Sequence, residues 1–222
     1  MFFLPFSVAI FFILILLLPV LFVLISVGAV GVAFQKLGLS SGTGLTFLFL
    51  SLLGSAINIP IQDKTVEVAE NNPEVSGLHS FFYGVQPHFL QKQILAINLG
   101  GCILPVMLCL YLLPKVPIVP TVACTAIMIV VSKLLARPTP GIGIAIPAFI
   151  PPVVSAILAL LFVGHHSATA VAYISGVLGV LIGADLLNIR TIQKYGRGVM
   201  SIGGAGVFDG IYLVGIIAVL IT

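Results

Sequence analysis

Charged residues are scarce in this sequence. Asp, Glu, Lys and Arg make up 7% of its 222 residues, against roughly 25% in an ordinary soluble domain. Hydrophobic residues make up 60%, and the mean hydropathy is +1.29. A chain with so few polar side chains cannot cover its own surface against water, so the sequence predicts a protein embedded in lipid over most of its length. A water-soluble fold is thereby excluded.

Other scarce residues narrow the possible sites and partners. The chain has 3 cysteines, in apolar runs, with no C-x-x-C pair and no histidine at ligand spacing, so neither a metal site nor another cofactor is predicted. The net charge of +3 is too small for a nucleic-acid footprint. The expected partners are instead the lipid bilayer, a small solute, ion or membrane peptide, and a second copy of the chain in a homo-oligomer.

Apolar stretches long enough to cross the hydrocarbon layer, about 20 residues each, recur along the whole chain. They lie near residues 6–34, 42–61, 93–113, 117–134, 141–163, 168–188 and 200–222. The predicted fold is an all-α polytopic membrane protein with about seven transmembrane helices, one or two of them broken or re-entrant. It forms a single transmembrane domain over 1–222, with a cytoplasmic polar loop at 62–92.

The basic residues predict the orientation, because cytoplasmic loops of membrane proteins carry the excess of Lys and Arg. With a cytoplasmic N-terminus, the outer loops hold only Lys36 and Lys115. The inner loops then hold Lys64, Lys92, Lys133, Arg137, Arg190, Lys194 and Arg197. We therefore expect a multi-pass protein whose N-terminus lies in the cytoplasm.

Hydrophobic residues alternate with polar ones around the start of the polar loop. They occupy every second position on both sides of the polar pair Asp63-Lys64, at Ile57, Ile59, Ile61, Val66 and Val68. A period of two on both sides of a polar pair predicts a small cytoplasmic β-hairpin with its turn at this pair.

Two segments depart from the pattern of a regular membrane helix. The first follows Arg137-Pro138-Thr139-Pro140-Gly141, where Gly141 and Gly143 alternate with isoleucines. We interpret residues 141–152 either as a re-entrant or broken helix or as a Pro-kinked continuous one. The second contains Gly203, Gly204, Gly206 and Gly210, whose spacing suits close helix packing or an accessible backbone at a binding site.

Asp185 and Asp209 are the acidic residues inside apolar segments. An ionisable group at membrane depth is costly unless it is paired or hydrated, so these two are the best functional candidates. Burial favours their protonated form, which suits proton transfer or acid catalysis. Asn188 follows Asp185 by one helical turn and is expected to share its hydrogen bonds. The structural alternative is an ion pair of Asp185 with a nearby basic residue: Arg190, Arg137 or Lys133.

Two acids on consecutive membrane helices resemble the dyad of intramembrane aspartyl proteases. The resemblance covers Gly183-Ala184-Asp185 and Gly206-Val207-Phe208-Asp209. It implies that Asp185 and Asp209 are catalytic, acting as general acid and base on a shared proton.

A second resemblance extends over the whole chain. It rests on Asn58-Ile59-Pro60, Asn98-Leu99-Gly100-Gly101, Arg137-Pro138-Thr139-Pro140-Gly141, Gly183-Ala184-Asp185-Leu186-Leu187-Asn188 and the stretch Gly203 to Gly210. These motifs resemble a prokaryotic family of uncharacterised multi-pass membrane proteins with no assigned activity. The resemblance implies a location in the prokaryotic plasma (inner) membrane and nothing about chemistry.

Three hypotheses remain for the function, and the sequence leaves open whether the protein is an enzyme. The first is a small carrier or proton- or ion-coupled protein, with Asp209 as the protonatable group, Asp185 and Asn188 as an outer relay and Arg137 at the mouth. Its backbone contacts would come from Gly141, Gly143, Gly203, Gly204 and Gly206. The second is an aspartyl-type hydrolase using the same two acids, and the third is a non-catalytic assembly or lipid-binding protein.

Overall fold

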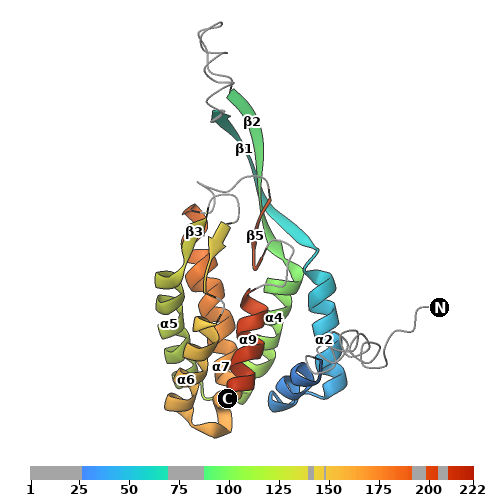
Figure 1. The fold of residues 1–222 in the computed structure, drawn as a ribbon, viewed down its shortest axis with the longest axis vertical. Helices are drawn as coiled ribbons and strands as arrows, with labels where there is room; N and C mark the ends of the chain where they lie inside the picture. The colour runs from blue at the N-terminus through green and yellow to red at the C-terminus, as the bar shows by residue number, and fades with distance from the viewer. Residues whose placement is uncertain (1–26, 70–87, 140–142, 148, 192–198, 205–209) are drawn as a thin grey trace, which may run out of the picture.

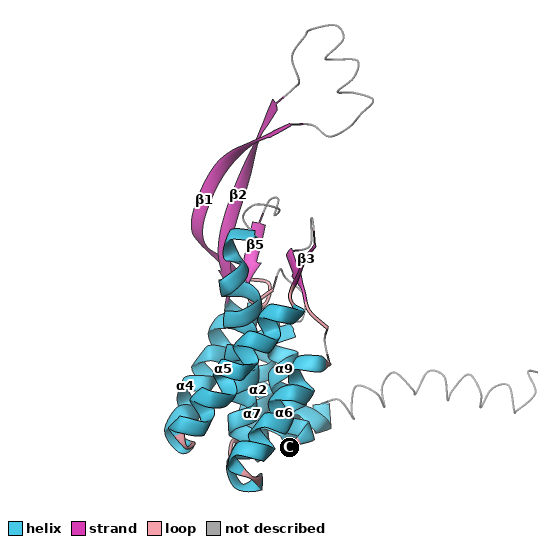
Figure 2. Cartoon of the chain, turned by 90° about the vertical axis from the view of Figure 1, so that its left-hand side faces the viewer, coloured by secondary structure: helices cyan, strands magenta, loops and turns pink. Residues whose placement is uncertain are grey.

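The fold is a helical bundle with its β-strands gathered at one end, which we call the sheet end (Figure 1). The computed structural model describes residues 27–69, 88–139, 143–147, 149–191, 199–204 and 210–222. The C-terminus lies at the opposite end of the bundle (Figures 1 and 2).

The helices follow the apolar stretches of the sequence. The α-helices are Val27–Lys36, α2 (Ser41–Gly54), α4 (Leu104–Leu112), α5 (Ile118–Leu135), α6 (Ile150–Val163), α7 (His165–Val180) and α9 (Gly210–Ile221). Shorter turns extend them: the π-helices η1 (Leu99–Ile103) and η3 (Leu181–Asp185), and the 3₁₀-helices η2 (Leu113–Lys115) and η4 (Leu186–Asn188). Helical structure therefore dominates the described part of the chain.

Local residues explain where several helices begin and end. The Ser40 hydroxyl accepts a hydrogen bond from the Thr43 N–H and caps the start of α2. Pro151 and Pro152 lie in the first turn of α6, where the missing N–H costs no helical hydrogen bond. Helix α6 ends at Gly164, which adopts a positive φ of 65°. These prolines begin the helix and do not kink it.

Helix α7 lies at the centre of the bundle and packs against α5, α6 and α9. Its Tyr173 and Val177 are fully buried. Apolar side chains instead point outward from the surrounding helices, with Val119, Leu134 and Leu161 between 75% and 79% exposed. An apolar exterior of this kind is suited to lipid and not to water.

Two described helices are long and apolar enough to cross a membrane, Ile118–Leu135 and Ser167–Thr191. A third span results if Val27–Lys36 and Ser41–Gly54, bent by 115°, are counted together. The apolar helices Leu99–Lys115 and Ile150–Val163 are shorter. The described residues therefore support a membrane protein with few full-length spans, and the count of seven stays a prediction.

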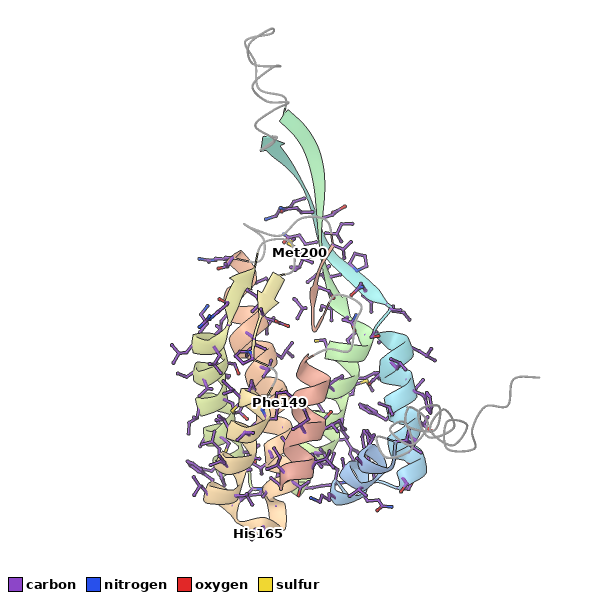
Figure 3. The ribbon with its side chains drawn as sticks, viewed as in Figure 1. Phe149, His165 and Met200 are labelled. Carbon is purple, nitrogen blue, oxygen red and sulfur yellow. The ribbon has the colours of Figure 1, made fainter. Side chains whose placement is uncertain are left out.

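A three-stranded sheet projects from the sheet end. Strand β1 (Asn58–Ala69) pairs antiparallel with β2 (His88–Asn98), and β2 pairs in parallel with the short β5 (Val199–Ile202), in the order β1-β2-β5. The β1–β2 hairpin extends well beyond the helices, and β5 lies beside its base (Figure 2). Met200 of β5 is buried at the junction of sheet and bundle, far from His165 at the other end (Figure 3).

The predicted cytoplasmic hairpin is correct in its strand character and wrong in its turn. Asp63 and Lys64 lie within β1, opposite Ile94 and Gln93 of β2. Strand β1 continues to Ala69, so the polar region 62–92 contains strand residues at both its ends. The alternating run forms one strand, and its partner β2 lies farther along the sequence, so the alternation does not show where the turn is.

Three predicted helix boundaries are also wrong. Residues 93–98 belong to β2, so helical structure begins at Leu99 and not at 93. The predicted helix 42–61 ends at Gly54, before β1. The predicted helix 200–222 begins with strand β5, and α9 starts at Gly210. In each case an apolar segment at the sheet end pairs as a strand. An apolar run alone does not distinguish a buried strand from a buried helix.

The described part of 141–152 is extended before it is helical, so the continuous Pro-kinked helix is wrong, and a re-entrant or broken helix stays a prediction. Strands β3 (Arg137–Thr139) and β4 (Gly143–Ala145) make a second antiparallel pair at the sheet end, and α6 begins only at Ile150 (Figure 1). The residue before Pro138 is biased toward extended backbone, which accounts for the end of α5 here. The alternation of Gly and Ile therefore marks a strand, while Gly141 itself lies outside the described residues.

Candidate functional site

The site is built around one hydrogen bond at the sheet end of the central helix. The Asp185 carboxylate, at the end of η3, accepts a hydrogen bond of 2.9 Å from the backbone N–H of Gly203. Asp185 lies within the apolar span Ser167–Thr191, and Gly203 directly follows β5. A backbone amide thus stabilises a carboxylate that lipid alone would not tolerate.

Gly203 can form this contact because it has no side chain. Its φ is +82° and that of Gly204 is +101°, which L-residues rarely adopt. A Cβ at Gly203 would lie 2.5 Å from the Cβ of Cys102 and 2.9 Å from its backbone N. Gly203 is therefore held between Cys102 of η1 and Asp185 of η3.

Both neighbours of Gly203 belong to π-helical turns, Cys102 to η1 and Asp185 to η3. Such turns are rare in proteins and occur frequently at functional sites. Each widens the helix by one residue and changes the direction of its side chains. Two of them meeting at one glycine turn mark this place as the strongest candidate site in the described structure.

A polar network continues from the glycine turn toward the hairpin. The Asn58 Oδ1 accepts hydrogen bonds from Ser201 Oγ at 2.6 Å and from Asn98 Nδ2 at 3.0 Å. Asn98 is 1% exposed, and its Oδ1 accepts from the Gly101 N–H and caps η1. Asn58 and Asn98 therefore join the strands to the bundle.

Asn188 does not share the hydrogen bonds of Asp185. Its Nδ2 donates to the carbonyls of Gly183 and Ala184 in its own helix, and its Oδ1 accepts from Lys133 Nζ. Lys133 also donates to the Leu187 carbonyl at 3.0 Å. The ammonium group thus caps the end of the central helix, where the helix dipole favours a positive charge. Asn188 is a structural residue in this arrangement.

Of the remaining predicted site residues, some lie in the described structure and others lie outside it. Arg137 is exposed on β3, and Gly143 lies opposite Thr139 on β4, both at the sheet end. Gly204 follows Gly203 in the turn. Gly206 and Asp209 lie outside the described residues, as Gly141 does, so the separation of the two acids stays a prediction. Among the described residues, no group of three His, Cys, Asp or Glu side chains is arranged to hold a metal ion.

Sequence reasoning missed Ser201 and Cys102 as neighbours of this site. Ser201 stands two residues before Gly203, and its hydroxyl is one of the few polar groups in an apolar stretch, which is a usable signal. Nothing in the sequence pointed to Cys102, because it meets Gly203 through tertiary packing alone.

Comparisons with known proteins assign no activity to this chain. No curated protein and no solved structure matches the chain, and no similarity to aspartyl proteases appears. A family model described as "Protein of unknown function (DUF1614)" matches residues 52–221, which include Asn58, Asn98, Asp185 and Gly203. Since this match covers most of the sequence, the chain belongs to the DUF1614 family of proteins of unknown function.

Proposed function

We propose that the protein is a small carrier or a proton- or ion-coupled membrane protein whose polar site includes Asp185. The observation that carries the proposal is the Asp185 carboxylate, which lies in a membrane-length apolar helix and receives a backbone hydrogen bond from Gly203. Carboxylates in such positions are typical of proton and ion pathways. Helices interrupted near a charged group are typical of carrier binding sites.

The distribution of basic residues supports a cytoplasmic location for the sheet end. Its described basic residues are Lys64 of β1, Lys92 of β2, Lys133 of α5, Arg137 of β3 and Arg190 after η4. Lys36 donates to the Val219 and Leu220 carbonyls near the C-terminus, at the other end of the bundle. Lys115 ends η2, which follows α4 at the end of that helix away from η1 and the sheet. By the positive-inside rule the sheet end faces the cytoplasm, so Asp185 would exchange protons or ions with that side. The prokaryotic plasma membrane is the location we propose.

The residues then take distinct roles. Asp209 is the deeper protonatable group, Asp185 the outer one, and Arg137 the cation at the cytoplasmic mouth. Backbone groups of the glycine segments would contact the ion or solute: Gly203, Gly204, Gly206, Gly141 and Gly143. We do not include Asn188 in the relay, because its side chain hydrogen-bonds with Lys133 and with backbone carbonyls of its own helix.

The test is proton flux in liposomes that contain the purified full chain, driven by a potassium diffusion potential and followed with an internal pH dye. We expect Asp185→Asn and Asp209→Asn each to lower the flux at least about tenfold, since an amide carries no proton. The matched control is Asp63→Asn on β1, outside the apolar helices, which should retain wild-type flux. Wild-type flux in Asp185→Asn would overturn the proposal, as would a wild-type protein that moves neither protons nor sodium.

A further inference from the structure

The proposed function uses Asp185 and Gly203 but does not explain the side chains that hold Gly203 in place. Gly203 follows the four residues described for β5, which lies at the edge of the described sheet, beside β2. So short an edge strand has few ladder hydrogen bonds to fix its position. A side-chain contact at β5 therefore has a large influence on where Gly203 lies.

Asn58 supplies that contact from β1, across the sheet. Its Oδ1 accepts from Ser201 Oγ of β5 at 2.6 Å and from Asn98 Nδ2 of β2 at 3.0 Å. Asn98 is itself fixed, because its Nδ2 also donates to the Ser55 carbonyl at 2.7 Å. One oxygen atom of Asn58 thus links all three strands two residues before the glycine that binds Asp185.

We propose that Asn58 is a positioning residue for Asp185. By holding Ser201 it fixes β5, and β5 in turn presents the Gly203 N–H to the Asp185 carboxylate. The state of the membrane carboxylate is therefore linked to the base of the β1–β2 hairpin. The effect on transport rests on the proposed function, whereas the geometric link to Gly203 does not.

The chain contains a natural reporter for this link. Cys102 is 8% exposed and lies against Gly203, so movement of the glycine turn away from η1 uncovers its thiol. The other two cysteines are buried elsewhere and can be replaced, so that Cys102 is the single thiol. Its rate of alkylation then measures how often the turn leaves its position.

The experiment compares N-ethylmaleimide alkylation of Cys102 in the purified full chain carrying Cys109→Ala and Cys124→Ala. Asn58→Ala should speed the reaction about tenfold, because losing the hydrogen bond from Ser201 of β5 weakens the closed position by roughly that factor. Asn58→Asp keeps an oxygen acceptor for the same two donors, so it should react at the parent rate. Ser55→Ala is the matched control, because the Ser55 hydroxyl donates only to Leu52 of its own helix.

Variants of Asp185 test the other end of the link. Asp185→Asn retains an oxygen that accepts from the Gly203 N–H, so Cys102 should stay protected, whereas Asp185→Ala should expose it. In the double variant Asn58→Ala with Asp185→Ala, the acceleration should fall well short of the product of the two single effects. Both changes release the same turn, and contacts within one network are not additive.

Equal Cys102 rates in Asn58→Ala and the parent would overturn the positioning role, and so would a rate in Asn58→Asp as fast as in Asn58→Ala. If Asn58→Ala does not fold, Ser201→Ala removes only the donor on β5 and should give the same acceleration. In the flux assay, Asn58→Ala should lose activity and Asn58→Asp should restore it. Normal flux in Asp185→Asn would refute the proposed function while leaving the alkylation result intact.

Discussion

The Asp185 carboxylate and the backbone nitrogen of Gly203 lie 2.9 Å apart, joining the end of the central membrane helix to the turn after β5. The partner of the acid is a main-chain N–H, so a change of side chain at position 203 does not itself provide this hydrogen-bond donor. What a substitution there changes is the backbone conformation that brings the amide to the carboxylate. This distinction leads to the first prediction.

Replacing Gly203 by alanine should destabilise the protein by about 2 to 4 kcal/mol. The new Cβ would lie 2.5 Å from the Cβ of Cys102, and the φ of +82° would be strained for any L-residue. Thermal unfolding in detergent, followed by circular dichroism, measures the loss.

Gly38→Ala separates the two causes in this prediction. Gly38 has a similar φ of +76°, but a Cβ added there would have nothing within 4 Å of it. It should therefore lose only about 1 kcal/mol, from backbone strain alone. Equal losses at the two glycines would show that the contact with Cys102 has no energetic weight.

Two buried serines should respond in opposite directions to alanine. The Ser132 hydroxyl is fully buried in the packing of α5 against η3 and has no hydrogen-bond partner among the described residues. Ser132→Ala removes this unpaired group and should stabilise the protein by about 0.5 to 1 kcal/mol.

Ser155 is the matched comparison, because it is equally buried and its hydroxyl donates to the Pro152 carbonyl at 3.0 Å. Ser155→Ala should lower stability by about 0.6 kcal/mol, a typical value for a hydrogen bond inside a membrane protein. Unfolding of both variants in the same detergent is the measurement. A loss of stability in Ser132→Ala would mean that its hydroxyl has a partner.

The orientation predicts which ends of the bundle are labelled from outside an intact cell. Lys64 and Lys115 are both exposed, and they lie at opposite ends of the molecule. A membrane-impermeant maleimide should label Lys115→Cys in intact cells and label Lys64→Cys only after the membrane is opened. The native cysteines are buried and give a low background. The reverse pattern would place the sheet end, and Asp185 with it, outside the cytoplasm.

Helices were predicted best where prolines lie at both ends of an apolar stretch of membrane-spanning length. The predicted span 117–134 corresponds to Ile118–Leu135, which lies between Pro117 and the Arg137-Pro138 pair. The sheet end was predicted poorly, because residues 93–98 belong to the apolar stretch 93–113, and its composition does not show where the strand ends and the helix begins. Their conformation is decided by β1 and β5, which pair with them over a long sequence separation.

The candidate site was predicted in parts and not as a unit. Asp185 and Gly203 were each singled out, one for its charge in an apolar helix and the other for its glycine segment. Their contact depends on the positive φ of Gly203 and on the register of β5 with β2, neither of which has a local signal. The hydrogen bonding predicted between Asn188 and Asp185 is wrong, because helical spacing places Asn188 near Asp185 but does not reveal the competing Lys133.

The parallel pairing of β5 with β2 also constrains how the protein is made. The hydrogen bond between Ser201 and Asn58 joins residues 143 positions apart, with α4, α5, α6 and α7 between them. During synthesis the β1–β2 hairpin emerges early, and the edge of β2 that pairs with β5 stays open until the intervening helices have been made. An open strand edge is a template for misassembly and a target for quality control. Completion of the sheet is thus a late step, which a nascent chain reaches only after these four helices have been synthesised.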